Sequence, residues 1–544
     1  MASALPILKV EALEASTTTT SPPHDSPLRA VVSGRFALTW HEFVVAFVFV
    51  LVYLLVSYLP LFNAITWRHI RSGDGIVAHR AVAAVDPALP LSDGFRAVST
   101  SWLSDVLFSQ IFRSAGLQGI SSTLVIAMTV LLVLTFAVFH LRTGRKRLAL
   151  AATALVLALH WPRLSILRPE MLGLVCFTLL LLLISQGKES DASRMRRLWL
   201  GCPALFLFWA NLDGSVVLGV VVLAGLAAAC FTDAYRETGS VWAAMRDRRF
   251  HQSVYLAEVA AAGSLLQPAG ISLWGDLFQN THSSAWLAVG GYSPLIVATA
   301  AGWTIVALWV LGAILLRLSE QPVLGKEIAL FALASLAVIV NQQLTIWSVP
   351  VMLWVVLPHL SELLERKNWF APKLHRPTFV DGDPVPPMAF AWTMLTVLAV
   401  WCGFALSPLS NPLLGGKLRT PQKLLSNATP LSLSQFLNNQ KSIPAGLIWV
   451  PEEWGDWLAL TGPAGLKISA NSQIHLLSDR QKIDILLVNR AEGNWTKTLD
   501  RYGVELLVVD KQRQSRLLDA ALAQGAEWSV AYEDGQALLL RRKS

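Results

Sequence analysis

The chain has 544 residues, of which 54% are hydrophobic and only 15% carry a charged side chain. Soluble domains carry about 25% charged residues, so this composition excludes a soluble enzyme of two or three domains, and it also excludes a disordered chain. The formal net charge of +8 would suggest a nucleic-acid partner, but many of the basic residues lie in short loops between apolar runs. The sequence therefore predicts a polytopic membrane protein.

Eleven apolar runs approach or exceed the length of about 20 residues that crosses the hydrocarbon layer. They cover 42–62, 119–139, 147–162, 170–186, 197–211, 214–232, 252–267, 295–316, 327–341, 344–361 and 389–406. The predicted count is eleven to within one or two spans, because the runs at 197–211 and 252–267 are short. The first run begins too far into the chain, and is too long, for a cleavable signal peptide.

Lysine and arginine gather in alternate loops. The loops after the second, fourth, sixth, eighth and tenth runs are the basic ones, and 142–147 is the densest of them. Short loops rich in these residues stay in the cytoplasm. The pattern therefore predicts a cytoplasmic N-terminus and, with eleven spans, an outward-facing C-terminal part.

Three regions follow from composition. Residues 1–40 are rich in Ser, Thr and Pro and are predicted to form a disordered cytoplasmic tail. Residues 41–406 form an all-α multi-pass membrane domain with a long outer loop at 63–118. Residues 407–544 have ordinary soluble composition and are predicted to form a small α/β extracytoplasmic domain.

Local patterns refine these regions. The outer loop contains two helix-like stretches, 64–80 and 100–115, whose mixed apolar and basic faces suit an interfacial helix. The tail alternates strand and helix patterns. Its strands are expected at 446–450 and 504–509, a helix at 513–523 and a hairpin at 527–541.

Charges inside the predicted spans are nearly absent, which argues against a proton-coupled carrier. Glu42 lies at a span edge, and Glu258 lies within the seventh run. Glu258 is interpreted as a carboxylate that pairs with a neighbour or reaches the cytoplasmic interface, although an intramembrane carboxylate can also be functional.

Polar residues instead collect at the predicted outer ends of the spans. The segments are 67–74, Asp86-Pro87, 102–105, Arg163, 168–170, 209–214, 267–270 and 341–343. Arginines beside an apolar wall can hold a phosphate by bidentate hydrogen bonds, and a nearby carboxylate can act as a general base. The alternative is that polar residues simply belong in loops, where arginine meets lipid headgroups.

The order of these segments resembles a broad group of bacterial polytopic membrane proteins related to the GT-C glycosyltransferases, such as protein O-mannosyltransferases and lipid A aminoarabinose transferases. The resemblance runs from about 42 to 541. It is carried by Trp67 with His69 and Gly73, Asp86-Pro87, Trp102-Leu103, Arg168-Pro169-Glu170, 209–214, 266–270, 453–458 and 499–504.

The resemblance implies a transferase that takes a sugar from a polyprenyl-phosphate donor and passes it to an acceptor outside the bacterial inner membrane. A first-loop acid would act as base, and Arg or Lys would grip the donor phosphate. The chain departs from the group at several positions. The leading first-loop acid would fall near Ile65, where no carboxylate stands, and Glu170 and Asp213 replace two histidines.

On this interpretation Asp86 or Asp74 supplies the base, and Arg168 with Arg71 holds the donor phosphate. His69, Asn211 and Asp213 line the acceptor side. Each proposed base has a structural alternative. Asp86-Pro87 can form a turn without a catalytic role, and Asp74 can serve only as an ion-pair partner of Arg71. We expect no cofactor and no structural metal, although the Asp-lined outer face leaves room for a divalent ion.

Two other functions stay open. A catalytically inactive membrane scaffold would bind an envelope protein or a glycan in a surface-polymer assembly, and the missing first-loop acid favours it. A flippase or solute transporter would need polar residues through the membrane depth. The expected partners are membrane lipids, a lipid-linked sugar donor and an envelope protein or glycan acceptor, with no nucleic acid.

Overall fold

The computed structural model describes residues 37–62, 65–83, 86–92, 99–186, 192–275, 294–367, 387–440, 446–525 and 527–543. The tail predicted to be disordered lies outside these ranges as far as residue 36. The chain divides into two compact units. The first is Met1–Val44 with His375–Leu398, and the second is Val45–Leu374 with Ala399–Ser544.

In the first unit, aromatic rings join the start of α1 (Trp40–Ser57) to α15 (Pro387–Leu406). The ring centroids of Trp40 and Trp392 are 4.7 Å apart. The Leu38 backbone N–H donates to Thr393 Oγ1 at 2.9 Å, which adds a polar contact beside the rings. Tryptophan at a helix end is typical of a membrane–water interface.

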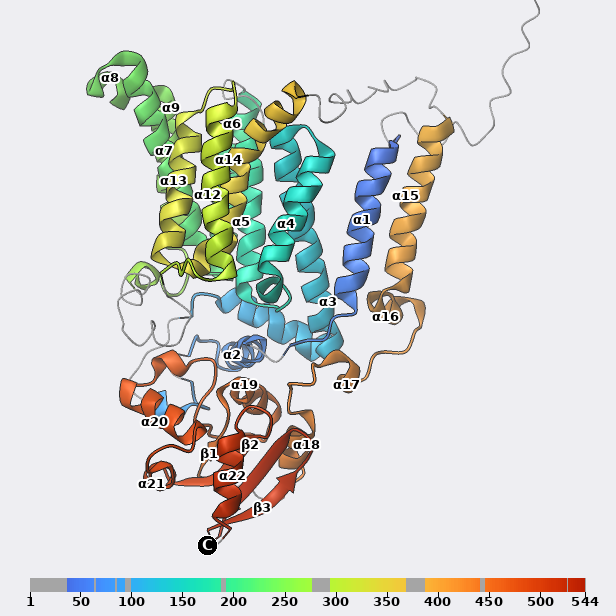
Figure 1. Cartoon of the computed structure of the whole chain (residues 1–544), viewed down its shortest axis with the longest axis vertical. Coiled ribbons are helices and arrows are strands. Elements are labelled where there is room, and N and C mark those ends of the chain that lie inside the picture. Colours follow the sequence, from blue (N-terminus) through green and yellow to red (C-terminus); the bar gives the residue numbers. More distant parts are fainter. Residues whose placement is uncertain are drawn as a thin grey trace, which may run out of the picture. The chain divides into compact units, whose positions relative to one another are not determined.

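The second unit contains most of the helices (Figure 1). They are α2 (Thr66–His79), η2 (Pro90–Ser92), α3 (Trp102–Thr143), α4 (Lys146–Leu164), α5 (Pro169–Ser185), α6 (Ala192–Leu212), α7 (Val216–Thr238), α8 (Val241–Met245), α9 (Arg248–Ser264), α12 (Ala300–Leu318), α13 (Gly325–Val340), η3 (Gln342–Leu344) and α14 (Thr345–Arg366).

A helix occupies each of the eleven predicted apolar runs. Among the described residues, five helices are long and apolar enough to cross a membrane by length and composition: α1, α3, α7, α14 and α15. The chain is thus a multi-pass membrane protein, and the count of eleven spans stays a prediction. In the most apolar part of α14, 83% of the residues are buried, so α14 lies in the bundle interior.

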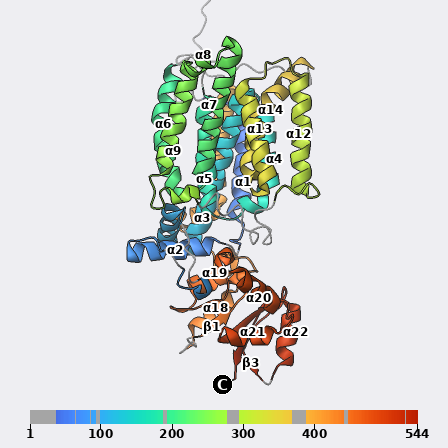
Figure 2. The ribbon, with the colours of Figure 1, turned by 90° about the vertical axis from the view of Figure 1, so that its left-hand side faces the viewer.

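Helix α3 combines two predicted helices, 100–115 and 119–139. Gly116 separates them, because its φ of 57° and ψ of −150° are not helical. Glycine adopts this conformation without the steric cost that a side chain would bring. The first part of α3 can therefore pack along α2 while the second part runs into the bundle (Figure 2).

The contact between α2 and α3 depends on Gly73. A Cβ on this residue would overlap the carbonyl oxygen of Asp105 and lie 2.7 Å from the Cβ of Ser109. Gly75, two residues further along α2, has open space around its missing Cβ. The two glycines of one helix therefore face opposite environments.

Replacing Gly73 by alanine is expected to destabilise the protein by about 1–3 kcal/mol, the usual cost of overpacking. Gly75→Ala is the matched control and should stabilise it by about 0.5–1 kcal/mol, because alanine has the higher helix propensity. Thermal unfolding in detergent measures both. Equal shifts in the two variants would contradict the close approach of α2 and α3.

The end of the bundle that carries the α3–α4 turn holds a buried ion-pair network, which lies at the ends of the predicted spans. Arg142 Nη2 donates to Glu327 Oε1 at 2.6 Å, and its guanidinium lies 3.9 Å from the ring centre of Trp354. His359 Nε2 lies 3.5 Å from Glu327 Oε2. The network joins α3, α13 and α14.

The C-terminal segment forms the predicted α/β domain. Its elements are η4 (Pro408–Ser410), α16 (Asn411–Leu414), α17 (Pro421–Leu424), α18 (Leu431–Asn438), β1 (Leu447–Trp449), α19 (Glu452–Thr461), η5 (Ile474–Leu476), α20 (Asp479–Asn489), α21 (Trp495–Arg501), β2 (Val504–Asp510), α22 (Ser515–Ala523), β3 (Trp528–Glu533) and β4 (Ala537–Arg542). The sheet order is β1-β2-β4-β3. Strand β1 pairs with β2 in parallel, and the other two pairs are antiparallel.

Part of the long outer loop belongs to this domain. The Ile468 N–H donates to the carbonyl of Ala88 at 2.9 Å, and Gln481 Nε2 donates to the carbonyl of Leu91 at 2.8 Å. Leu89 is fully buried in the core of the domain. Residues 86–92 therefore fix the loop to the C-terminal domain.

Candidate functional site

The candidate site lies along α2, where this helix meets α19 of the C-terminal domain (Figure 2). The rings of Trp67 and Trp457 meet edge to face, with centroids 4.9 Å apart. Both side chains are buried, so an apolar wall stands beside the polar residues that follow Trp67 in α2. Hydrogen bonds and ion pairs are stronger beside such a wall than in water.

His69 is the centre of a buried hydrogen-bond chain. Its Nδ1 lies 2.7 Å from Asp105 Oδ1, and its Nε2 lies 3.1 Å from Arg68 Nη2. Ser101 Oγ donates to the same Asp105 oxygen at 3.1 Å. Because a guanidinium can only donate, Nε2 accepts and Nδ1 carries the proton. Burial, and then the charge of Arg68, lowers the pKa of His69, which favours the neutral ring.

Arg71 and Asp86 form an ion pair at the loop–domain junction. Asn471 Nδ2 donates to Asp86 Oδ2 at 3.1 Å, and the Ala88 N–H donates to Asp86 Oδ1 at 2.9 Å. Burial alone would raise the pKa of Asp86, but the hydrogen bond and charge of Arg71 hold it below its usual value. Both carboxylate oxygens of Asp86 therefore accept hydrogen bonds. This arrangement agrees with the alternative in which Asp86-Pro87 forms a turn.

Asp74 lies elsewhere on α2, and the expected pair with Arg71 does not form. Its Oδ1 accepts hydrogen bonds from Arg113 Nε at 2.6 Å and from Ser109 Oγ at 2.7 Å, both on α3. About a third of the Asp74 side chain is exposed. Asp74 therefore links α2 to α3, whereas Arg71 binds Asp86.

The turn between α4 and α5 brings Arg168 close to His69. Thr66 Oγ1 donates to the Leu167 carbonyl at 2.6 Å, which fixes the start of α2 on this turn. The positive charge of Arg168 contributes to the lowered pKa of His69. No described residue hydrogen-bonds the Arg168 side chain, and its Nε is buried. Its Nε therefore lacks a hydrogen-bond partner among the described residues, and the carboxylate whose charge acts on this guanidinium is Glu170.

Glu170, the residue that replaces a histidine of the resembling group, is held by Arg163. Arg163 Nε donates to Glu170 Oε2 at 2.9 Å. The same guanidinium donates through Nη1 to the carbonyl of Gln343 at 2.6 Å. Arg163 thus joins the α4–α5 region to the turn before α14. The Nε of Arg168, in the α4–α5 turn, keeps no hydrogen-bond partner among the described residues.

Asn211 and Asp213 shape the neighbouring α6–α7 turn. Trp102 Nε1 donates to Asn211 Oδ1 at 2.7 Å, and Asn211 Nδ2 donates to the Leu266 carbonyl at 3.0 Å. Asp213 Oδ2 accepts the Ser215 N–H at 3.0 Å. Burial raises the pKa of Asp213 to about 6. The structure thus places both residues as supports of the turn.

Asp213→Asn is expected to stabilise the protein near pH 7.5 by about 1–2 kcal/mol, and by much less near pH 5. The folded-state pKa of about 6 exceeds the ordinary value of 3.8, so this carboxyl contributes stability at low pH that is lost as pH rises through 6. The amide keeps an acceptor for Ser215. Unfolding midpoints at both pH values measure the difference, and a pH-independent effect would contradict a buried carboxylate.

Asp456 is a site residue that the sequence did not single out. It lies on α19 and is 3% exposed. The Ser472 N–H donates to its Oδ2 at 3.3 Å, while no described residue hydrogen-bonds its Oδ1. Burial raises the pKa of Asp456, and the charges of Arg68 and Arg71 oppose that effect. The sequence feature that could have identified Asp456 is its position as an acidic residue between two tryptophans in the segment 453–458.

Two of the predicted residues therefore interact electrostatically at α2: His69, next to the Arg68 guanidinium, and Arg168. Arg71 and Asp86 lie at the same junction but bind each other. Asn211, Asp213 and Asp74 lie in the surrounding supports. Within the described ranges, no three His, Cys, Asp or Glu side chains come together as metal ligands.

Comparison with solved structures identifies the fold. The chain resembles the oligosaccharyltransferase of the archaeon Archaeoglobus fulgidus tethered to an acceptor peptide, with a TM-score of 0.51 and 11% identity over 93% of this chain and 74% of that one. The same enzyme with an inhibitory peptide and a dolichol-phosphate gives a TM-score of 0.54 and 12% identity over 87% and 70%. No family model matches the chain, and no curated protein matches it in sequence.

These enzymes are GT-C glycosyltransferases, so the comparison supports a GT-C-like fold over most of this chain. At this low sequence identity the comparison supports only the fold and no particular activity, because one fold can host many activities. The comparison therefore supports the predicted GT-C-like fold and nothing more specific.

Proposed function

We propose that the chain is a GT-C-type membrane glycosyltransferase that moves a sugar from a polyprenyl-phosphate donor to an extracytoplasmic acceptor. The observation that carries the proposal is the Arg168 guanidinium, which is partly buried, lacks a hydrogen-bond partner among the described residues and lies near His69. An arginine in such a place suits a phosphate. We place the chain in a bacterial inner membrane, with the N-terminus cytoplasmic and the C-terminal domain outside.

In this proposal Arg168 binds the donor phosphate, and Arg68 and Arg71 strengthen the positive potential around it. His69 acts as the general base in place of Asp86 or Asp74, because ion pairs occupy both carboxylates. Asp105 holds the His69 ring in the tautomer whose Nε2 accepts a proton. Arg68 leaves Nε2 when it turns toward the phosphate.

The reaction then balances simply. A bond forms between the acceptor oxygen and the sugar C1, and the bond from C1 to the phosphate oxygen breaks. The acceptor proton moves to His69 Nε2, and the electron pair leaves on the phosphate held by Arg168. Stabilising this leaving charge by a preorganised guanidinium is the largest contribution that we assign to the protein.

Arg168→Ala is expected to weaken binding of polyprenyl phosphate at least tenfold, since it removes a charge-assisted contact of about 1.5–3 kcal/mol. The measurement is titration of a short-chain polyprenyl phosphate onto the full protein in nanodiscs. Arg113→Ala is the matched control, because Arg113 is half-exposed and pairs with Asp74. Equal loss in both variants would show a general charge effect and overturn the assigned role of Arg168.

The second candidate is the catalytically inactive membrane scaffold, favoured by one observation: the ion pairs of Asp74 and Asp86 leave neither proposed carboxylate free. The same titration separates the two functions. A scaffold would not bind polyprenyl phosphate at Arg168, and it would tolerate replacement of His69, Asp74 and Asp86.

A further inference from the structure

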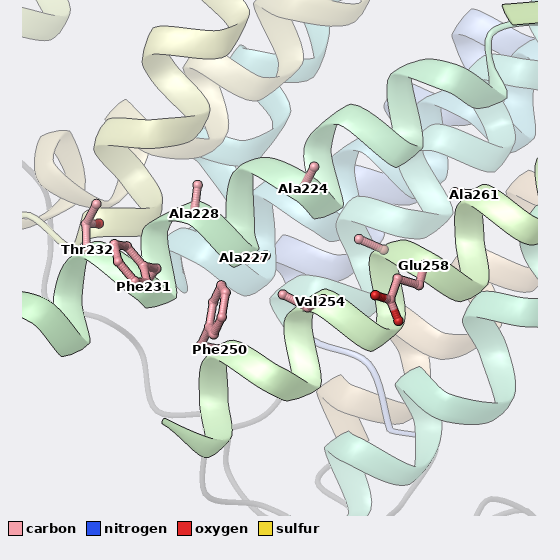
Figure 3. Close-up of a pocket in the computed structure, with 10 residues that line it drawn as sticks. Ala224, Ala227, Ala228, Phe231, Thr232, Phe250, Val254, Glu258 and Ala261 are labelled. Carbon is pink, nitrogen blue, oxygen red and sulfur yellow. The ribbon is translucent and has the colours of Figure 1, made fainter. Parts of the chain in front are cut away.

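An open groove of about 540 Å³ lies between α7 and α9 (Figure 3). Small side chains form its floor at one-turn spacing on both helices: Ala224 and Ala228 on α7, and Ala257 and Ala261 on α9. Glu258 of α9 is the only acidic residue that lines it.

Glu258 lies too deep along α9 to reach either end of the helix. Ten residues separate it from Arg248, which corresponds to about 15 Å along the helix axis, and six separate it from Ser264, about 9 Å. The side chain is exposed on the helix surface, and no described residue pairs with it. Among the described residues no partner supports the first alternative drawn from the sequence, a paired neighbour, while the cytoplasmic interface stays a prediction.

An exposed carboxylate at this depth needs a partner. α7 is long and apolar enough to cross a membrane, and α9 packs along it, so we expect the groove between them to face the hydrocarbon layer. Ionisable residues within membranes normally pair with one another or face a water-filled cavity. Apart from Glu258 and Thr232, the lining of this groove is apolar, so water alone does not satisfy the carboxylate.

We propose that the groove is the docking site for a transmembrane helix of a partner protein that carries a Lys or Arg at mid-depth. The alanines permit the close backbone approach that helix pairs in membranes use, and Glu258 supplies the complementary charge. An acyl chain carries no cation, and headgroup amines lie at the surface. A second copy of this chain packed on the same face would bring another carboxylate.

The test uses two synthetic helices of 21 residues, built from Leu and Ala, that differ only in a central Lys or Leu. Energy transfer from each labelled peptide to the full protein in nanodiscs reports binding. We expect the Lys peptide to bind about five- to thirtyfold more tightly than the Leu peptide, the range that polar contacts between membrane helices give. Glu258→Gln should abolish the difference, and Ala228→Leu should weaken the Lys peptide by filling the groove.

A charge swap makes the test specific. Glu258→Lys should prefer a peptide with a central Glu, whereas a groove that simply holds apolar chains would ignore the swap. Glu258 makes no hydrogen bond to a described residue, so these variants should keep the unfolding midpoint of the native protein. Equal binding of the Lys and Leu peptides, lipid retained in the groove by native mass spectrometry, or a dimer lost on Ala228→Leu would each overturn the proposal.

Discussion

Glu327→Ala is expected to destabilise the protein by about 3–5 kcal/mol, the cost of removing one partner of a buried ion pair. The Glu327 side chain is 5% exposed and accepts from Arg142 at 2.6 Å and from the Leu324 N–H at 3.1 Å. Without it, the Arg142 guanidinium stays between α3 and α14 with its charge uncompensated. We expect the variant to unfold at a markedly lower temperature in detergent.

The matched control is Glu320→Ala. Glu320 also pairs with an arginine, Arg366, but its side chain is 75% exposed, so its loss should cost less than about 1 kcal/mol. Glu327→Gln keeps an acceptor for Arg142 and should fall between the two. A Glu327→Ala midpoint equal to that of Glu320→Ala would show that the network does not hold the three helices together.

This network shows where sequence reasoning stops. Apolar runs located the helices, because burial in lipid or in the bundle interior leaves a continuous pattern that a single sequence displays. Glu327 lies at the start of such a run. Arg142 lies in a basic loop that served only to predict the orientation in the membrane. Nothing in either segment indicates that they meet, because their contact depends on packing between helices 185 positions apart.

The candidate site divides in the same way. Residues in one segment, such as Trp67 and His69, could be selected from their order and resemblance. The partner of each charge could not: Asp86 binds Arg71 and the distant Asn471, while Asp74 binds Arg113. Asp105 stayed unselected although its helix was predicted, because its contact with His69 needs the crossing of α2 and α3 at Gly73.

His69→Gln is expected to lower sugar transfer by about 10²–10⁴-fold, the usual contribution of a general base. Glutamine can still hydrogen-bond Asp105 but cannot take the acceptor proton. The measurement is transfer of labelled sugar from a polyprenyl-phosphate donor in vesicles that contain the protein, together with titration of polyprenyl phosphate. A base should lose the transfer rate while phosphate binding changes little.

The pH profile tests the same role independently. Burial and the charge of Arg68 lower the pKa of His69, so the neutral ring persists below its ordinary value of 6.5, and the acidic limb of the rate should lie below that pH. Asp105→Asn removes a charge that raises this pKa, so it should move the limb further down. Asp74→Asn, which touches only the Arg113 pair, should leave the limb unchanged. Loss of transfer in Asp74→Asn or Asp86→Asn with full activity in His69→Gln would return the base to a carboxylate, because only the true base must accept the proton.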